Sequence, residues 1–191
     1  MTYVTLVDDL PIYENLLEEL HKVLPNWATY RSVCLNSPIG INDHQFGNGS
    51  LYYDWTKKTK VVNDRGEVSF DVPLRDLPLK ETDFVELCSI FTGTVFEEIY
   101  QTLLSKYVLG RVRIMTSQSN SCLSWHVDDT RRLHYPIKTQ EGCFMVIEDT
   151  VNQLEQNKWY LTDTTVKHTA FNGSKDARVH LVACIVKERN D

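Results

Sequence analysis

The fold is decided by residues 110–147, which read GRVRIMTSQSNSCLSWHVDDTRRLHYPIKTQEGCFMVI. Turn residues such as Gly142 separate short β-type runs within this stretch, and further runs follow towards the C-terminus. The runs lie at residues 112–115, 123–127, 133–137, 143–147, 159–161, 168–171 and 178–187. Many short strands at this spacing are typical of an antiparallel sandwich or barrel. We therefore predict a mainly β fold for this part of the chain.

The residues before this stretch carry the helical patterns instead. Apolar residues recur at close to a helical period over residues 10–24, where Asp8 or Asp9 can cap the start. A second helix is predicted over residues 83–107, with Gly93 as a weak point within it. These helices are expected to pack against one outer face of the β structure and to support it.

Between the two predicted helices, residues 60–70 favour a hairpin with its turn at residues 63–66. We expect a single domain over residues 1–191, because no linker or repeat divides the chain. Residues 1–109 would form a helix-rich, supporting α+β region, and residues 110–191 the barrel half. The order of elements fits a double-stranded β-helix, which is the jelly-roll or cupin-like core.

Composition narrows the classes of partner. The chain has 26 acidic and 20 basic residues, for a net charge of −6, and an acidic protein is a poor default binder of nucleic acid. No stretch is apolar enough to cross a membrane, and no signal peptide is evident. The five cysteines are scattered and form no C-x-x-C pair, which suits a reducing compartment. We therefore expect a cytoplasmic protein, of undetermined oligomeric state.

The most informative segment for chemistry is SWHVDD at residues 124–129. In a strand, residues i and i+2 point to the same face, so His126 and Asp128 can present an imidazole and a carboxylate to one point. One histidine from another strand would complete a set of two histidines and a carboxylate, and His168 is the best candidate. Such a set leaves half of an octahedral Fe(II) open for a co-substrate and O₂.

A second signal comes from Arg178, which begins the very apolar run RVHLVACIV. A cation in such a run needs a partner if it points inward, and its guanidinium is matched to a carboxylate such as that of a dicarboxylate co-substrate. His180 shares the parity of Arg178, so it could face the same cavity, although a hydrogen-bonded core histidine is the expectation for it. Taken singly, Asp128 could be a turn residue, and His168 or Arg178 a surface residue. The combination is more specific, because residue type, order and strand context must all agree.

Residues 111–186 resemble the aspartyl/asparaginyl β-hydroxylase family of Fe(II)- and 2-oxoglutarate-dependent oxygenases. The matching pieces are H-x-D at 126–128, R-x-H-x-P at 132–136, and an arginine ten positions after His168. The resemblance implies roles for six residues: His126, Asp128 and His168 as catalytic metal ligands, Arg178 as the clamp for the remote carboxylate of 2-oxoglutarate, and His134 and Arg132 as further co-substrate contacts.

The resemblance also implies an enzyme and its cofactors. These are Fe(II), 2-oxoglutarate as co-substrate and O₂, with ascorbate in support. The implied reaction hydroxylates an amino-acid side chain and releases succinate and CO₂; the substrate is an Asp, Asn or Pro residue of a peptide, or a free amino acid. A peptide would need an open groove beside the barrel. A free amino acid would need a closed pocket with a second carboxylate-binding cation, for which Arg113 and Arg131 are candidates.

Two other classes of protein stay open on the sequence. One is a non-catalytic cupin-like module that binds a metal or a small acid as a sensor. The other is a zinc or nickel enzyme of the cupin type, such as an isomerase. Formation of succinate would distinguish the oxygenase from both.

Overall fold

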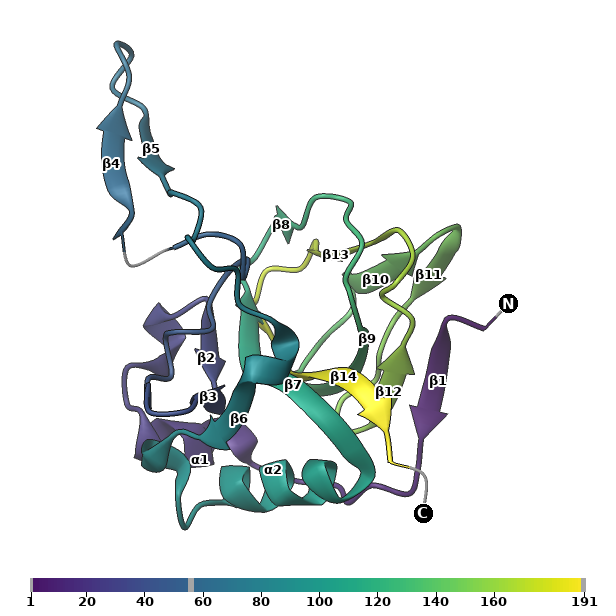
Figure 1. Cartoon of the computed structure of the whole chain (residues 1–191). Coiled ribbons are helices and arrows are strands. Elements are labelled where there is room, and N and C mark those ends of the chain that lie inside the picture. The colour runs from purple at the N-terminus through teal and green to yellow at the C-terminus, as the bar shows by residue number, and fades with distance from the viewer. Residues whose placement is uncertain (1, 55–56, 190–191) are drawn as a thin grey trace.

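The computed structural model describes residues 2–54 and 57–189. Its centre is a pair of antiparallel sheets (Figure 1). Within the described residues, the larger sheet has six strands in the order β1-β12-β9-β14-β7-β2. Their bounds are β1 Val4–Val7, β2 Ser32–Cys34, β7 Tyr107–Ser117, β9 Arg131–Lys138, β12 Trp159–Thr162 and β14 Arg178–Glu188. The smaller sheet has the order β11-β10-β13-β8, with β8 Ser121–Cys122, β10 Cys143–Ile147, β11 Thr150–Asn152 and β13 His168–Asn172.

From β7 onward the chain alternates between the two sheets. Strands β7, β9, β12 and β14 belong to the larger sheet, whereas β8, β10, β11 and β13 belong to the smaller one. Buried Met145 and Ile147 of β10 pack with Tyr160 of β12, which joins the inner faces of the two sheets. This alternate winding is a double-stranded β-helix, so the predicted mainly β fold of the jelly-roll or cupin type is confirmed.

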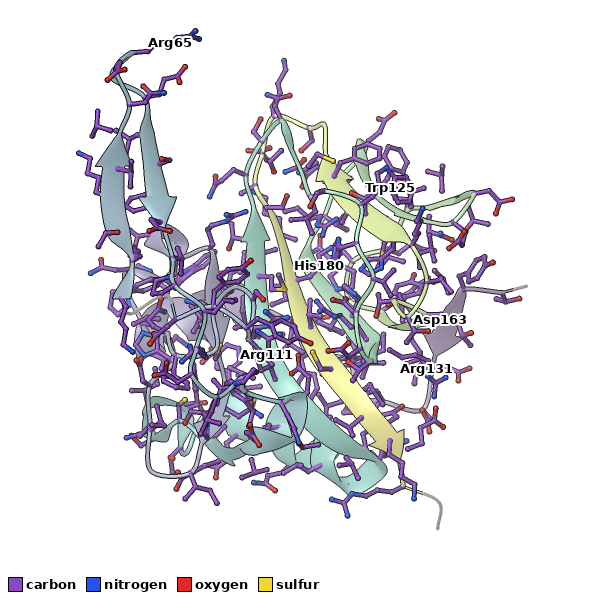
Figure 2. The ribbon with its side chains drawn as sticks, turned by 45° about the horizontal axis from the view of Figure 1, so that its top comes forward. Arg65, Arg111, Trp125, Arg131, Asp163 and His180 are labelled. Carbon is purple, nitrogen blue, oxygen red and sulfur yellow. The ribbon has the colours of Figure 1, made fainter. Side chains whose placement is uncertain are left out.

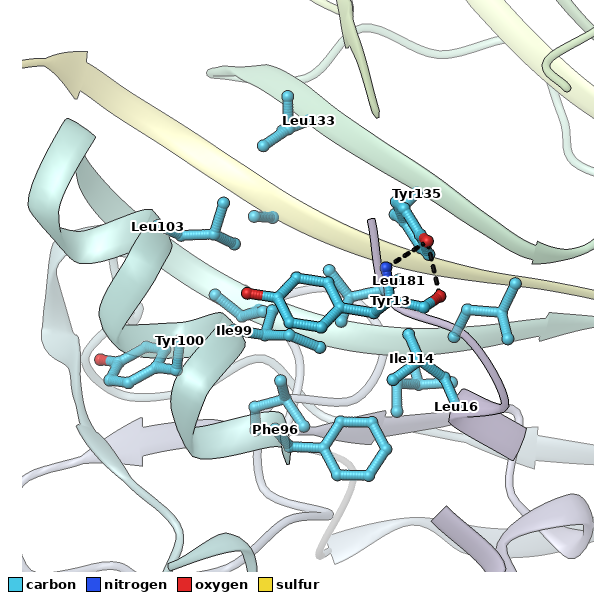
Figure 3. Packing of buried hydrophobic residues seen from close by; sticks show 14 of the residues in the cluster. Tyr13, Leu16, Phe96, Ile99, Tyr100, Leu103, Ile114, Leu133, Tyr135 and Leu181 are labelled. Atoms are coloured by element: carbon cyan, nitrogen blue, oxygen red, sulfur yellow. Dashed lines mark hydrogen bonds between the residues drawn. The ribbon is translucent and has the colours of Figure 1, made fainter. Parts of the chain in front are cut away.

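Helices cover the outer face of the larger sheet. Helix α1 spans Leu16–Val23 and α2 spans Val95–Lys106, and both contribute to the main apolar core. Figure 3 shows Phe96, Ile99 and Leu103 of α2 packed against Ile114 and Leu181 of the sheet. Two hydrogen bonds fix the approach to α1: the Tyr135 hydroxyl donates to the Tyr13 carbonyl oxygen at 2.6 Å and accepts from the Tyr13 amide at 2.9 Å.

The inner face of the larger sheet is more polar than its sequence suggests. Along β14, Leu181 and Ala183 belong to the core beneath the helices, and alternate side chains of a strand point to opposite faces. Arg178, His180 and Val182 therefore face the smaller sheet. The apolar run of β14 thus hides a polar side, and this side positions the candidate site.

The N-terminal region is less helical than predicted. The second helix begins at Val95 and not at residue 83, because Gly93 adopts a positive φ of 74° and Thr94 caps the helix. Before it, β6 (Phe84–Leu87) pairs with β3 (Asn36–Pro38). The first helix starts at Leu16, after Asn15 in the left-handed region, so the predicted capping by Asp8 or Asp9 is wrong.

The region before β7 is also tied into the larger sheet. Strand β1 pairs with β12 along one edge, and β2 pairs with β7 along the other. The N-terminal third of the chain therefore supplies both edge strands of the larger sheet.

The helices are shorter than the predicted ones. No helix of the described residues has the length and apolar character needed to span a bilayer.

The predicted hairpin is present, as β4 (Thr59–Val62) paired with β5 (Val68–Asp71). Gly66 has a φ of 77° at the turn, and its amide donates to the Asn63 carbonyl oxygen at 2.9 Å. Figure 1 shows the hairpin projecting from the body of the molecule. One predicted strand, over residues 123–127, is not a regular strand: it forms an isolated bridge between His126 and His168.

Candidate metal and co-substrate site

His126 and Asp128 lie on an extended segment between β8 and β9. The His126 amide donates to the His168 carbonyl oxygen at 3.1 Å, and the His168 amide returns a bond of 2.9 Å. The Asp128 amide donates to the Thr164 carbonyl oxygen at 2.9 Å. This backbone pairing holds the segment extended, so the i and i+2 side chains share a face even without a regular strand. Trp125, of opposite parity, is 56% exposed at the outside of the barrel (Figure 2).

The structure brings together the three residues that the sequence predicts as ligands. One nitrogen of each imidazole and one carboxylate oxygen of Asp128 lie within 4.8 Å of one another. His168 Nε2 is 3.3 Å from Asp128 Oδ2, and the two imidazole rings lie 4.2 Å apart between centroids. His168 is buried, whereas His126 and Asp128 are partly exposed. We call these three residues the candidate metal centre.

Backbone carbonyl groups orient both imidazoles. His126 Nδ1 lies 2.7 Å from the Ser124 carbonyl oxygen, and His168 Nδ1 lies 3.0 Å from that of Val166. A carbonyl oxygen can only accept, so each Nδ1 carries a hydrogen, and in the neutral imidazole each Nε2 then has a free lone pair. Metal-binding histidines are typically held in this way, with the second ring nitrogen donating to a carbonyl or carboxylate. The two Nε2 atoms are therefore available to one cation.

Asp128 supplies the charge of the set. Arg132 Nη2 lies 2.6 Å from Asp128 Oδ1. Oδ2 is buried and faces His168, without a hydrogen bond to any other described residue. Burial opposes the charge, yet the adjoining His168 and Arg132 lower the pKa of Asp128 below its ordinary value, so the carboxylate is ionised at neutral pH. An orphaned carboxylate oxygen beside two imidazole lone pairs fits Fe(II), which is commonly held by two histidines and one carboxylate.

A narrow pocket lies beside this centre, and Arg178 is one of its lining residues. Its lining residues come from β9, β10 and β14 and from the segments after β9 and β11: His134, Thr139, Cys143, Phe144, Met145, Leu154, Arg178 and His180. Arg178 Nη1 reaches the Phe144 carbonyl oxygen at 3.5 Å, and no carboxylate of the described residues pairs with its guanidinium. The pocket thus holds a cation without an anion.

Two histidines share this pocket. All four ring nitrogens of His134 and His180 are buried without a hydrogen-bond partner among the described residues, and the ring centroids lie 5.8 Å apart. Burial, reinforced by Arg178, lowers the pKa of each well below its ordinary value, so both are neutral at pH 7. The expectation that His180 is a hydrogen-bonded core histidine is therefore wrong. Its parity with Arg178 already carried the signal that it faces the pocket.

The other two arginines predicted near the site, Arg132 and Arg131, lie outside the lining of the Arg178 pocket. Arg132 contacts Asp128 and is absent from the lining of the Arg178 pocket, so its role as a co-substrate contact stays a prediction. Arg131 is exposed and pairs with Glu188 at 2.6 Å, at the edge of the molecule (Figure 2). Thr139 of the pocket lining was not anticipated, because it follows β9 in a turn where strand parity gives no signal.

Residues 71–188 match the sequence profile of a family described as aspartyl/asparaginyl beta-hydroxylase. The match includes the whole candidate metal centre and the Arg178 pocket, and it spans more than half of the chain. The chain belongs to the aspartyl/asparaginyl beta-hydroxylase family. It is therefore an oxygenase, and the resemblance seen in the sequence is confirmed.

Solved structures offer more remote likenesses. An oxidoreductase of the 2OG-Fe(II) oxygenase family from Burkholderia pseudomallei is 13% identical over 95% of this chain and 84% of that chain, with a TM-score of 0.45. A cupin domain from Bordetella pertussis is 19% identical over 40% of this chain and 81% of that chain, with a TM-score of 0.36. No curated protein sequence matches the chain significantly. The assignment of this chain to its family rests on the match over residues 71–188 and not on these distant structures.

Proposed function

We propose that this oxygenase depends on Fe(II) and 2-oxoglutarate and hydroxylates the side chain of an amino acid, free or within a peptide. One observation carries the proposal. Two imidazole Nε2 atoms and the Asp128 carboxylate converge beside a pocket that contains the unpaired Arg178 guanidinium. A site for a divalent cation next to a site for a carboxylate suits a co-substrate that binds both.

Each residue has a role that its surroundings support. His126, Asp128 and His168 would hold Fe(II), and Arg132 would keep Asp128 charged and aimed at it. The fork of Arg178 would pair with the remote carboxylate of 2-oxoglutarate. His134 and His180, being neutral, can donate hydrogen bonds to that anion without adding charge. The bound iron, with 2-oxoglutarate and O₂, supplies the oxidising power for C–H hydroxylation, with succinate and CO₂ as products.

The apolar walls of the pocket matter as well. Phe144, Met145 and Leu154 line the space around Arg178 and restrict water there. An ion pair formed in such surroundings is stronger than one in water, and a buried cation without its anion is costly. The pocket therefore favours an anionic occupant over water.

A cytoplasmic location and the absence of a nucleic-acid partner stay predictions from composition.

Production of succinate tests the proposal. The purified protein is incubated with Fe(II), ascorbate, 2-oxoglutarate and O₂, and succinate is measured against a sample without iron. We expect succinate to form slowly even without the amino-acid substrate. Protein that neither retains iron nor forms succinate would instead favour the cupin-like binding or sensor module.

A variant separates the two parts of the site. Arg178→Gln should weaken 2-oxoglutarate binding by about 30-fold or more, because it removes one partner of a buried charge pair. Iron binding should be unchanged, since Arg178 contacts no member of the candidate metal centre in the described residues. Arg131→Gln is the matched control, because Arg131 is exposed and paired with Glu188. Loss of iron affinity in Arg178→Gln would contradict the role given to Arg178.

A further inference from the structure

Arg113 is a buried cation that the proposed chemistry leaves without a role. It lies on β7 with only 4% of its surface exposed. Two arginines close to it have anionic partners: Arg111 Nη2 lies 2.7 Å from Glu81 Oε1, and Arg132 pairs with Asp128. Arg113 makes no hydrogen bond or ion pair with any residue that the structure describes, and its Nε atom is fully buried. Of these three arginines, Arg113 is the one without a directly paired anion among the described residues; the nearby Glu81 carboxylate, whose pKa the Arg113 charge helps to lower, forms its ion pair with Arg111.

Such an arrangement destabilises the protein unless an anion arrives. Burial, with a further contribution from Arg111, lowers the pKa of Arg113 to about 10, so the guanidinium still carries its charge at neutral pH. Removal of a charge from water is unfavourable when no partner compensates for it. An apolar residue would serve packing better at this position of β7. The charge therefore points to a ligand and not to a structural role.

Strand register places Arg113 on the side of the sheet that faces the site. Arg113 is paired with Val182 of β14, and Val182 is paired with His134 of β9. Paired residues point to the same face of a sheet, so Arg113, Val182 and His134 form one row across its inner face. At the usual strand spacing, Arg113 stands about 10 Å from His134. It also lies near enough to Arg132 for the two charges to affect each other.

Arg178 lies in a different part of the same face. It is four residues before Val182 on β14, and the usual rise per residue puts it about 13 Å from the row of Arg113. The inner face thus carries two cations without anions among the described residues. One of them belongs to the proposed co-substrate pocket, and the other lies towards the Asp128–Arg132 pair.

We propose that Arg113 binds a carboxylate of the primary substrate, which makes that substrate an amino acid with a free carboxylate near the hydroxylated carbon. The proposal rests on the proposed function. The carboxylate is the α-carboxylate of a free amino acid or the side chain of an acidic residue in a peptide. Arg131, the other candidate cation, is excluded by its exposure and by its pairing with Glu188. Arg113 is thus a specificity-determining residue that recognises charge inside the barrel.

Paired acids and amides test the proposal on the protein loaded anaerobically with Fe(II) and 2-oxoglutarate. The free-ligand arm uses the L-amino acids and their carboxamides, and the peptide arm uses acetyl-Ala-Asp-Ala-amide and its Asn counterpart. Binding is measured by calorimetry. We expect an acid in one arm to bind at least tenfold more tightly than its amide, because the amide leaves the Arg113 charge unpaired. The arm that responds identifies the source of the carboxylate.

Variants of Arg113 complete the test. Arg113→Gln should abolish the preference for the acid, Arg113→Lys should keep part of it, and Arg131→Gln should keep all of it. Without ligands, Arg113→Met should melt at or above the temperature of the wild type, because it removes an unpaired buried charge. Equal binding of acid and amide, an undiminished preference in Arg113→Gln, or no binding in either arm would overturn the proposal. If the wild type still forms succinate in these cases, the proposed function stands and only the role of Arg113 fails.

Discussion

The two imidazoles of the candidate metal centre are oriented by their own local backbone. In each case the carbonyl group two residues earlier accepts from Nδ1, so Nε2 is presented inward. Asp128 is held differently, through Arg132, which lies four residues later on β9. A short segment, from the loop before β9 to the start of that strand, thus contains both a candidate ligand and the cation that orients it. This compact arrangement makes Arg132 a testable part of the metal site.

Substitution of Arg132 should weaken the binding of a metal. Arg132→Gln removes the ion pair to Asp128 Oδ1, and loss of a group that orients a ligand typically costs 10- to 100-fold in metal affinity. Titration with Fe(II) under anaerobic conditions measures this change. Arg131→Gln alters the neighbouring arginine, which pairs with Glu188, and should leave the affinity at the wild-type level. Equal affinity in both variants would show that Arg132 does not support the centre.

Residue-level patterns predicted much of the site. The i and i+2 spacing correctly placed His126 and Asp128 on one face of their extended segment. Strand parity likewise placed Arg178 and His180 on the same face of β14, the inner face that lines the pocket. The sequence could not show that Arg132 would turn to Asp128, because that contact depends on the path of a loop. Nor could it distinguish Arg113 from Arg131, since only packing decides which of the two is buried.

Elements were predicted best where alternation and turns agree. The run at residues 143–147 coincides with β10, and those at 133–137 and 178–187 lie within β9 and β14. The predicted second helix failed over residues 83–94, because its apolar residues are also those of a short strand and a 3₁₀ turn that pack on the same core. Helical periodicity in the sequence cannot distinguish these alternatives when every segment is half apolar.

The start of α2 provides an element-scale prediction. The Thr94 hydroxyl accepts from the Phe96 amide at 3.2 Å and donates to the Phe91 carbonyl oxygen at 2.6 Å. Thr94→Ala should lower the free energy of unfolding by about 1 kcal/mol, the usual cost of losing such a cap. Thr94→Ser keeps the hydroxyl and should lose little. Urea denaturation followed by circular dichroism compares the three proteins, and an unchanged midpoint in Thr94→Ala would argue against the cap.

At the scale of the whole molecule, the site makes the fold sensitive to acid. Burial lowers the pKa of His134 and His180 well below 6.5, whereas in the unfolded chain both titrate near that value. Above about pH 6.5 both histidines are unprotonated in the folded and the unfolded chain, so their titration does not change the stability. Below it the unfolded chain binds more protons, so stability falls as the pH approaches the folded-state pKa, by up to about 1.4 kcal/mol per pH unit for each histidine.

A variant isolates this contribution. Between pH 7 and pH 5, without metal or co-substrate, His180→Phe should lose less stability than the wild type, by up to about 2 kcal/mol. Urea denaturation at the two pH values gives the difference. His21→Gln changes an exposed histidine of α1 and should behave like the wild type. An identical loss in His180→Phe and the wild type would mean that His180 is not held neutral in the folded protein.

The central claim concerns the whole site: one cation held by His126, Asp128 and His168, with a dicarboxylate beside it. Anaerobic equilibrium dialysis against Fe(II) and 2-oxoglutarate tests it most directly. We predict one iron per chain, 2-oxoglutarate retained when iron is present, and loss of both in Asp128→Ala but not in the adjacent Asp129→Ala. Failure of the wild type to retain iron, or equal retention in the two variants, would contradict the account.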